Sequence, residues 1–171
     1  YPSYGKDRIV YSFALHPNVE EYIVKVPMKL FGYASSQDRE VGVEVIESES
    51  TAKEDVDFVI EQKRMEANAY KDSLIVRIKK SAEVETKDLV VKLRLCGNDL
   101  FAAAPIDAET FRIILTSQLT EPTGWPFGDY SVIKHKFVIQ TIGIATGYEK
   151  WSISDSIRYK GILTKALYEY N

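Results

Sequence analysis

Short runs in which apolar and polar residues alternate fill the first two thirds of the chain. Successive side chains of a β-strand point to opposite faces, so this period of two predicts strands with one buried face. The predicted strands span residues 8–13, 22–30, 41–45, 73–79, 89–95 and 111–115. Turn-forming residues separate them and no long helical pattern intervenes. Residues 1–118 therefore predict a mainly β fold, an antiparallel sandwich rather than parallel βαβ units.

Two of these runs carry further detail. Pro27 has no backbone N–H, so the strand that contains it is expected at a sheet edge or at a bulge. In the run 41–45 the valines are expected to point inward, with Gly42 and Glu44 toward solvent.

The pattern changes after Gln118. Residues 121–128 contain two prolines and two glycines, which predicts a loop. Farther on, apolar residues recur at the spacing of one helix face, and Ser154 or Asp155 is placed to cap this helix. The apolar face consists of Tyr159, Ile162, Leu163, Ala166, Leu167 and Tyr170.

Residues 129–142 fit two patterns. The spacing of Tyr130, Ile133 and Phe137 suits a helix capped by Asp129. The residues at 133, 135, 137 and 139 alternate with Lys134 and Lys136, which suits a strand equally well. We favour the helix. Residues 119–171 are then a short α-helical C-terminal extension, a loop plus two helices. We expect it to pack against the sandwich rather than to form an independent domain.

Composition excludes several classes of protein. The net charge is −3, whereas a general nucleic-acid binder is usually basic. No apolar run approaches the length of a transmembrane helix. The sequence holds no signal peptide, but it opens abruptly at Tyr1, so this absence excludes no class of protein. The single cysteine, Cys96, excludes an internal disulfide and a cysteine metal cluster.

Signatures of catalysis are missing. The sequence has no nucleophile-elbow serine, no phosphate-binding glycine loop and no paired-histidine zinc motif. Cys96 and His135 could form a thiol nucleophile and its base, but nothing basic adjoins Cys96 to lower the pKa of its thiol. We expect no catalytic residues, and a protein that is not an enzyme.

Acidic and amide side chains in two predicted loops raise the possibility of calcium binding. Asp55, Asp57, Asn98 and Asp99 offer the oxygen ligands that calcium prefers. Calcium needs six or more converging oxygens, so ordinary loop polarity is the alternative. We expect no other cofactor.

Three aromatic residues are the candidates for ligand binding. Trp125 and Phe127 lie in the Pro/Gly-framed loop, and Trp151 follows it. Exposed aromatic faces can stack on sugar rings. The alternative is that these side chains pin the extension in place.

Two stretches resemble known families. Residues 44–60, with Thr51-Ala52 followed by Asp57-Phe58, and the strands after them resemble the Calx-beta and immunoglobulin-like repeat pattern. The resemblance implies a Calx-beta-like sandwich. Calx-beta calcium sites use several acidic residues, of which only Asp57 and Asp99 match here, so calcium binding is not carried over.

Residues 127–137 and 163–171 resemble the C-terminal half of an uncharacterised family of Bacteroidetes envelope lipoproteins. The resemblance implies a helix over 130–140 and an outer-membrane lipoprotein anchored through a cysteine upstream of Tyr1. Members are typically encoded beside outer-membrane nutrient-uptake systems of the starch-utilisation type. The family has no established activity, so no functional residues are carried over.

Together these observations favour a non-catalytic, cell-envelope accessory binding component of a nutrient-uptake system. Its expected partners are a glycan or a peptide, and an outer-membrane transporter or its binding lipoprotein. The alternative is a structural or adhesion spacer module, which calcium could stabilise.

Overall fold

The computed structural model describes residues 3–4, 7–103 and 110–169. The chain divides into two compact units. One consists of residues 1–13 and 19–117, and the other of residues 14–18 and 118–171. We call them the N-terminal unit and the C-terminal unit, and describe each by itself.

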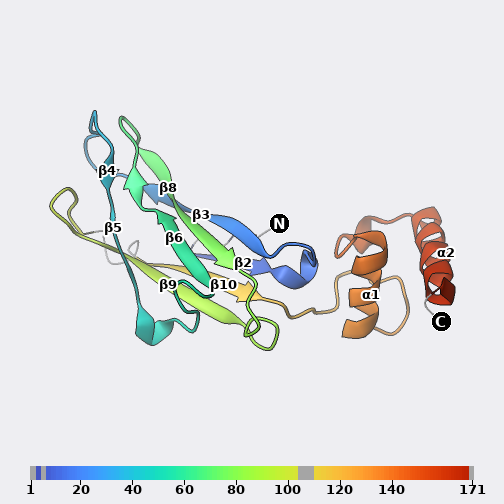
Figure 1. Cartoon of the computed structure of the whole chain (residues 1–171). Coiled ribbons are helices and arrows are strands. Elements are labelled where there is room, and N and C mark those ends of the chain that lie inside the picture. The colour runs from blue at the N-terminus through green and yellow to red at the C-terminus, as the bar shows by residue number, and fades with distance from the viewer. Residues whose placement is uncertain (1–2, 5–6, 104–109, 170–171) are drawn as a thin grey trace. The chain divides into compact units, whose positions relative to one another are not determined.

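Two main sheets form the N-terminal unit (Figure 1). The five-stranded sheet has the order β1-β2-β10-β9-β5 and the three-stranded sheet the order β3-β8-β6, while β4 and β7 form a short ribbon. The strands of the first sheet are β1 (Ser3–Tyr4), β2 (Arg8–Ser12), β5 (Gly42–Val45), β9 (Leu89–Cys96) and β10 (Thr110–Thr116). The others are β3 (Glu21–Lys29), β6 (Phe58–Gln62), β8 (Lys71–Lys79), β4 (Arg39–Glu40) and β7 (Arg64–Met65).

Both sheets bury their apolar positions in one shared core. Along β3 every second residue is buried from Val24 to Met28, and the same alternation runs along β8 and β9. Val24, Val76, Val91 and Ile113 are fully buried and represent both sheets. The sandwich predicted from the period of two is thus confirmed.

Pairing within the sheets agrees with the prediction except at one place. Pro27 lies in β3, which is an edge strand as predicted. β2 and β10, however, pair in parallel, with Ile9 opposite Ile113. Every other ladder is antiparallel among the described residues.

Two α-helices lie in the described part of the C-terminal unit, α1 (Val132–Ile142) and α2 (Ile153–Glu169). The helix predicted for 129–142 is confirmed, but its cap is Ser131, whose Oγ accepts a hydrogen bond from the Lys134 N–H at 3.2 Å. The prediction that Asp129 caps this helix is therefore wrong.

The cap predicted for the second helix is also corrected. Ser152 Oγ accepts from the Asp155 N–H at 3.1 Å, and the Asp155 carboxylate accepts from the Ser152 N–H at 3.0 Å. This reciprocal capping box makes Ser152 the cap and Asp155 its partner. Of the predicted apolar face, Leu163 is buried, whereas Ile162 and Leu167 are exposed. Tyr170 lies outside the described residues.

Candidate functional site

A hollow lies at the end of the sandwich where β3 and β9 finish. Its volume is about 540 Å³, within the usual range for small-molecule sites. Apolar side chains from both sheets form most of its wall, all of it within the N-terminal unit. We call it the end pocket, lined by Pro27, Met28, Lys29, Leu30, Phe31, Val41, Met65, Leu95, Cys96, Phe101, Ala102 and Ala103.

Backbone hydrogen bonds hold the segments around the end pocket. The Leu30 N–H donates to the Tyr70 carbonyl at 2.9 Å and so extends the β3–β8 pairing past Lys29. The Val41 N–H donates to the Lys63 carbonyl at 2.8 Å, which fixes the start of β5 beside β7. The walls are therefore set by the sheet framework.

Asn98 positions one aromatic wall residue. Its Oδ1 accepts hydrogen bonds from the N–H groups of Leu100 and Phe101, each at 2.9 Å. Its Nδ2 donates to the Glu40 carbonyl at 2.9 Å. The amide thus closes the turn after β9 and brings Phe101 to the pocket.

Aromatic and cationic side chains surround the opening. Phe31, which lines the pocket, is 71% exposed although it is large. The Arg39 guanidinium lies 4.3 Å from the centroid of the Phe101 ring, and the Lys29 ammonium lies 5.4 Å from that of Phe31.

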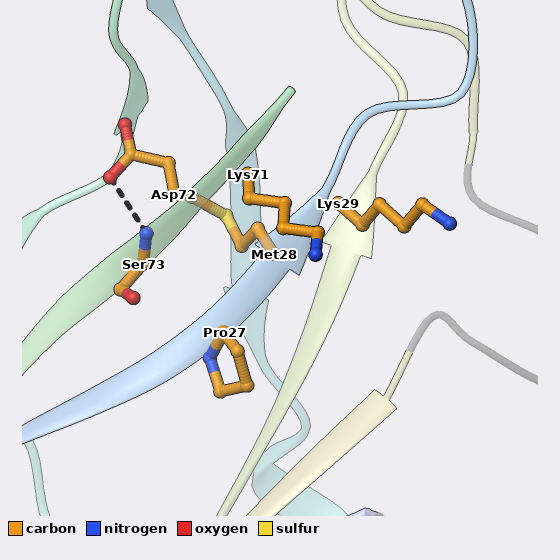
Figure 2. Close-up of a pocket in the computed structure, with 6 residues that line it drawn as sticks. All are labelled: Pro27, Met28, Lys29, Lys71, Asp72 and Ser73. Carbon is orange, nitrogen blue, oxygen red and sulfur yellow. Dashed lines mark hydrogen bonds between the residues drawn. The ribbon is translucent and has the colours of Figure 1, made fainter. Parts of the chain in front are cut away.

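Two lysines face each other across the neighbouring strand pair. Lys29 of β3 and Lys71 of β8 are direct partners in the antiparallel register. They line a second hollow, of about 460 Å³, with Pro27, Met28, Asp72 and Ser73 (Figure 2). In Figure 2 both lysine side chains extend toward the same side of the strand pair.

Cys96 adds no reactive group to the pocket. Burial raises the pKa of its thiol, and a hydrogen bond to Glu44 raises it further. Glu44 is itself paired with Arg94. A thiol with a raised pKa is a poor nucleophile at neutral pH.

The structure brings the three predicted aromatic residues together, but in the core of the C-terminal unit. Trp125 makes edge-to-face contacts with Phe127 at 5.0 Å and with Tyr148 at 5.6 Å between ring centroids. Trp151 contacts Phe127 and Tyr148 in the same way. The three side chains are half-buried around the buried residues Val138, Tyr148 and Leu163. Their packing fits the pinning alternative, and ligand binding there stays a prediction.

His135 is also buried and contacts the rings of Trp125 and Tyr148. Its Nε2 lies 2.8 Å from the Ala145 carbonyl oxygen and its Nδ1 lies 3.3 Å from the Tyr130 hydroxyl. Both ring nitrogens therefore have partners within the unit.

The four candidate calcium ligands do not form one group. Residues 51 and 52 bond to Val90 at the start of β9, so Asp55 and Asp57 follow near that end. Asn98 and Asp99 follow Cys96, where β9 finishes. Eight residues of strand span about 25 Å, so the two pairs lie at opposite ends of β9. The described residues contain no cluster of three or more Asp, Glu, His or Cys side chains suited to a metal ion.

Sequence reasoning missed the residues of the end pocket. Phe31, of the end pocket, lies two residues after the end of β3 and together with Tyr33 flanks Gly32, which has a φ of 127°. In the sequence, two large aromatic residues on either side of a glycine were a signal for an exposed aromatic loop. Lys29 and Lys71 could not have been paired without the register of β3 against β8.

A family model matches residues 1–144, and the chain belongs to that family: DUF4843, a domain of unknown function. No curated protein matches the chain.

Solved structures are similar to this chain at low sequence identity. One is a protein of Bacteroides ovatus ATCC 8483 to which carbohydrate binding has been ascribed, with 10% identity, a TM-score of 0.47, and coverage of 66% of this chain and 36% of that one. A second is EndoBT-3987 of Bacteroides thetaiotamicron with its Man5GlcNAc product, at 10% identity and a TM-score of 0.45, covering 64% and 28%. A third is the calcium binding domain CBD12 of CALX1.1, at 16% identity and a TM-score of 0.44, covering 64% and 41%. This chain thus spans well under half the length of each.

None of the helices described here has the length and apolar character needed to cross a lipid bilayer.

Proposed function

We propose that this protein is a non-catalytic binding module of a cell-envelope lipoprotein, and that it assists an outer-membrane nutrient-uptake system. The end pocket carries the binding part of this proposal, because a hollow of about 540 Å³ walled by apolar side chains is the usual form of a ligand site. The resemblance of residues 127–137 and 163–171 to Bacteroidetes envelope lipoproteins supports the cellular role.

The pocket wall distinguishes between the two expected ligand classes. A sugar carries hydroxyl groups around its ring, and burying them without hydrogen bonds is costly. Apart from Lys29 and Cys96, the side chains of the end pocket are apolar. A peptide with an apolar side chain suits this wall better than a glycan does.

The non-catalytic assignment rests on chemistry. The Cys96 thiol has a raised pKa, and both ring nitrogens of His135 have partners in the other unit. A thiol with a raised pKa is a poor nucleophile, and a ring nitrogen engaged in a hydrogen bond is not free to transfer a proton.

A binding screen with a blocked variant tests the proposal. Peptide pools and glycan pools are added to the ¹⁵N-labelled protein while its amide NMR signals are followed. Ala102 lines the pocket and is exposed, so Ala102→Trp is expected to fill the hollow without unfolding the chain. We expect a peptide pool to shift signals around Leu30 and Leu95 in the wild type and not in the variant. Shifts that persist in Ala102→Trp, or no shift with any pool, would contradict the proposal.

A further inference from the structure

The facing lysines Lys29 and Lys71 have no anionic partner in the part of the chain that the structure describes. Lys29 and Lys71 are exposed, and neither takes part in a salt bridge among these residues. Like charges directly opposite each other in an antiparallel ladder destabilise it. The pair is therefore a local cost to the free protein, and an anion bound between the two ammonium groups would remove it.

Nearby carboxylates are already engaged. Asp72 Oδ2 accepts the Glu66 N–H at 2.8 Å, and Asp72 Oδ1 accepts the Ser73 N–H at 2.7 Å, as the dashed line in Figure 2 marks. Asp38 pairs with Arg64. Glu40, in turn, pairs with Lys63. None of these carboxylates forms a salt bridge with Lys29 or Lys71 among the described residues.

We infer that the end pocket recognises the C-terminal residue of a peptide: Lys29 and Lys71 pair with the terminal carboxylate, and the apolar last side chain enters the pocket. This inference rests on the proposed function, because it names the ligand class of the same site. Lys29 joins the two halves, since it belongs to the lysine pair and also lines the end pocket.

The backbone of β3 favours a peptide over a simple amphiphile such as a fatty acid. The Leu30 N–H points to Tyr70, on the β8 side, so by the alternation of an antiparallel ladder the N–H and C=O of Lys29 face the free edge. An extended peptide can pair with these groups. Pro27 has no N–H, so a longer added strand would lose a hydrogen bond two residues away. The edge thus suits the end of a peptide better than its middle.

The wall of the pocket suits the last side chain. Met28, Val41 and Met65 are buried at its base, while Phe31 stands exposed at the opening. Methionine side chains adapt to apolar groups of different shape. The pocket should therefore accept leucine, methionine or phenylalanine at the peptide C-terminus and exclude charged residues.

Titration calorimetry with matched peptides tests the inference. The probes are N-acetylated tetrapeptides with three glycines followed by leucine or phenylalanine, each as the free acid and as the C-terminal amide. Sodium laurate is a separate probe for a fatty-acid site. We expect the acids to bind at least about 10-fold more tightly than the amides, since charge-assisted hydrogen bonds are lost in the amide. Added salt should reduce this preference.

Charge-removing variants locate the carboxylate. Lys29→Gln and Lys71→Gln should each weaken binding of the acids about 3- to 10-fold and leave the amides unchanged. Lys25→Gln is the matched control, because Lys25 is an exposed lysine on the same face of β3, four residues from Lys29. It removes the same charge and should leave both affinities as they are.

A stability measurement tests whether the two lysines have a structural role instead. The double variant Lys29→Gln/Lys71→Gln should be at least as resistant to urea as the wild type, because the like-charge pair is gone. A double variant that was less stable and bound the acids normally would overturn the inference.

The remaining outcomes separate this inference from the proposed function. Equal binding of acids and amides, blocked by Ala102→Trp, would overturn carboxylate recognition and leave a peptide site. Binding of laurate without any peptide would overturn the peptide assignment. If neither these probes nor the pooled peptides and glycans bind, the proposed function fails as well.

Discussion

The buried Asp57 carboxylate holds the turn before β6 through the backbone of Lys53: Oδ2 accepts the Lys53 N–H at 2.7 Å. The Asp57 N–H donates in return to the Lys53 carbonyl at 2.8 Å. Asp57 is fully buried and its hydrogen bond is part-buried, so loss of the carboxylate would leave the Lys53 N–H without this partner. We expect Asp57→Ala to lower the free energy of unfolding by about 1–3 kcal/mol, measured by urea denaturation.

Two further variants test this account of Asp57. Asp57→Asn keeps an oxygen acceptor and should lose less stability than Asp57→Ala. Asp55→Asn is the control, since Asp55 is exposed and two residues away. If Asp55→Asn destabilised the protein as much as Asp57→Ala, the stability of the turn would depend on its negative charge rather than on the hydrogen bond from Lys53 to Asp57.

Gly124 is required by a close backbone approach within the C-terminal unit. A Cβ at this position would lie 2.6 Å from the Glu149 nitrogen and 2.7 Å from its Cα, and φ is +74°. Gly128 has nearly the same φ, +73°, but nothing lies within 4 Å of its Cβ position. Gly128→Ala should therefore cost about 1 kcal/mol through backbone strain alone. Gly124→Ala should cost about 3 kcal/mol, because overpacking is added.

The loss of stability in Gly124→Ala and in Gly128→Ala can be measured by near-UV circular dichroism during urea unfolding, because Trp125 and Trp151 report on the C-terminal unit. Equal destabilisation by the two substitutions would show that Glu149 does not approach Gly124 in solution.

The start of α2 should depend on pH. A hydrogen bond from the Ser152 hydroxyl, followed by one from its N–H, holds the pKa of Asp155 below its ordinary value of 3.8. The folded pKa is thus lower than the unfolded one, so the contribution is fully present above about pH 4 and is lost as pH falls through the folded pKa. Helicity of α2, followed by NMR chemical shifts of residues 153–157, should fall in that window.

Asp155→Asn cannot ionise and is the control for this titration. The variant should show lower helicity at the start of α2 at neutral pH and no acid transition of its own there. An unchanged acid transition in the variant would assign the pH dependence to another carboxylate.

The sandwich could be predicted because each strand buries one face and exposes the other, which produces a sequence period of two. β6 was missed, since Phe58, Val59 and Ile60 are apolar in succession and a register shift between Ile60 and Gln62 breaks the alternation. The parallel pairing of β2 with β10 has no local signal, because it joins the two ends of the N-terminal unit. Caps were misplaced by two or three residues, since several polar residues compete at each helix start.

Candidate sites were harder to predict than strands for a physical reason. Trp125 and Trp151 are conspicuous in the sequence, but a large aromatic residue serves a small core as readily as a ligand. The end pocket depends on residues far apart in the chain, such as Met28, Met65 and Phe101. Only the strand register and the Asn98 turn bring them together, and neither is visible in local patterns.

Removal of the C-terminal unit tests whether it stabilises the rest of the protein. The sequence predicts that the two helices pack on the sandwich, and residues 14–18, between β2 and β3, cluster with 118–171. A chain that ends at Gln118 would leave residues 14–18 without the remainder of their unit. We therefore expect this truncation to melt at a lower temperature than the full chain in differential scanning calorimetry. The matched comparison is the full chain with Gly124→Ala, which weakens the same unit and removes no residue. A soluble truncation with an unchanged melting temperature would contradict the predicted packing and make the C-terminal unit a separate module.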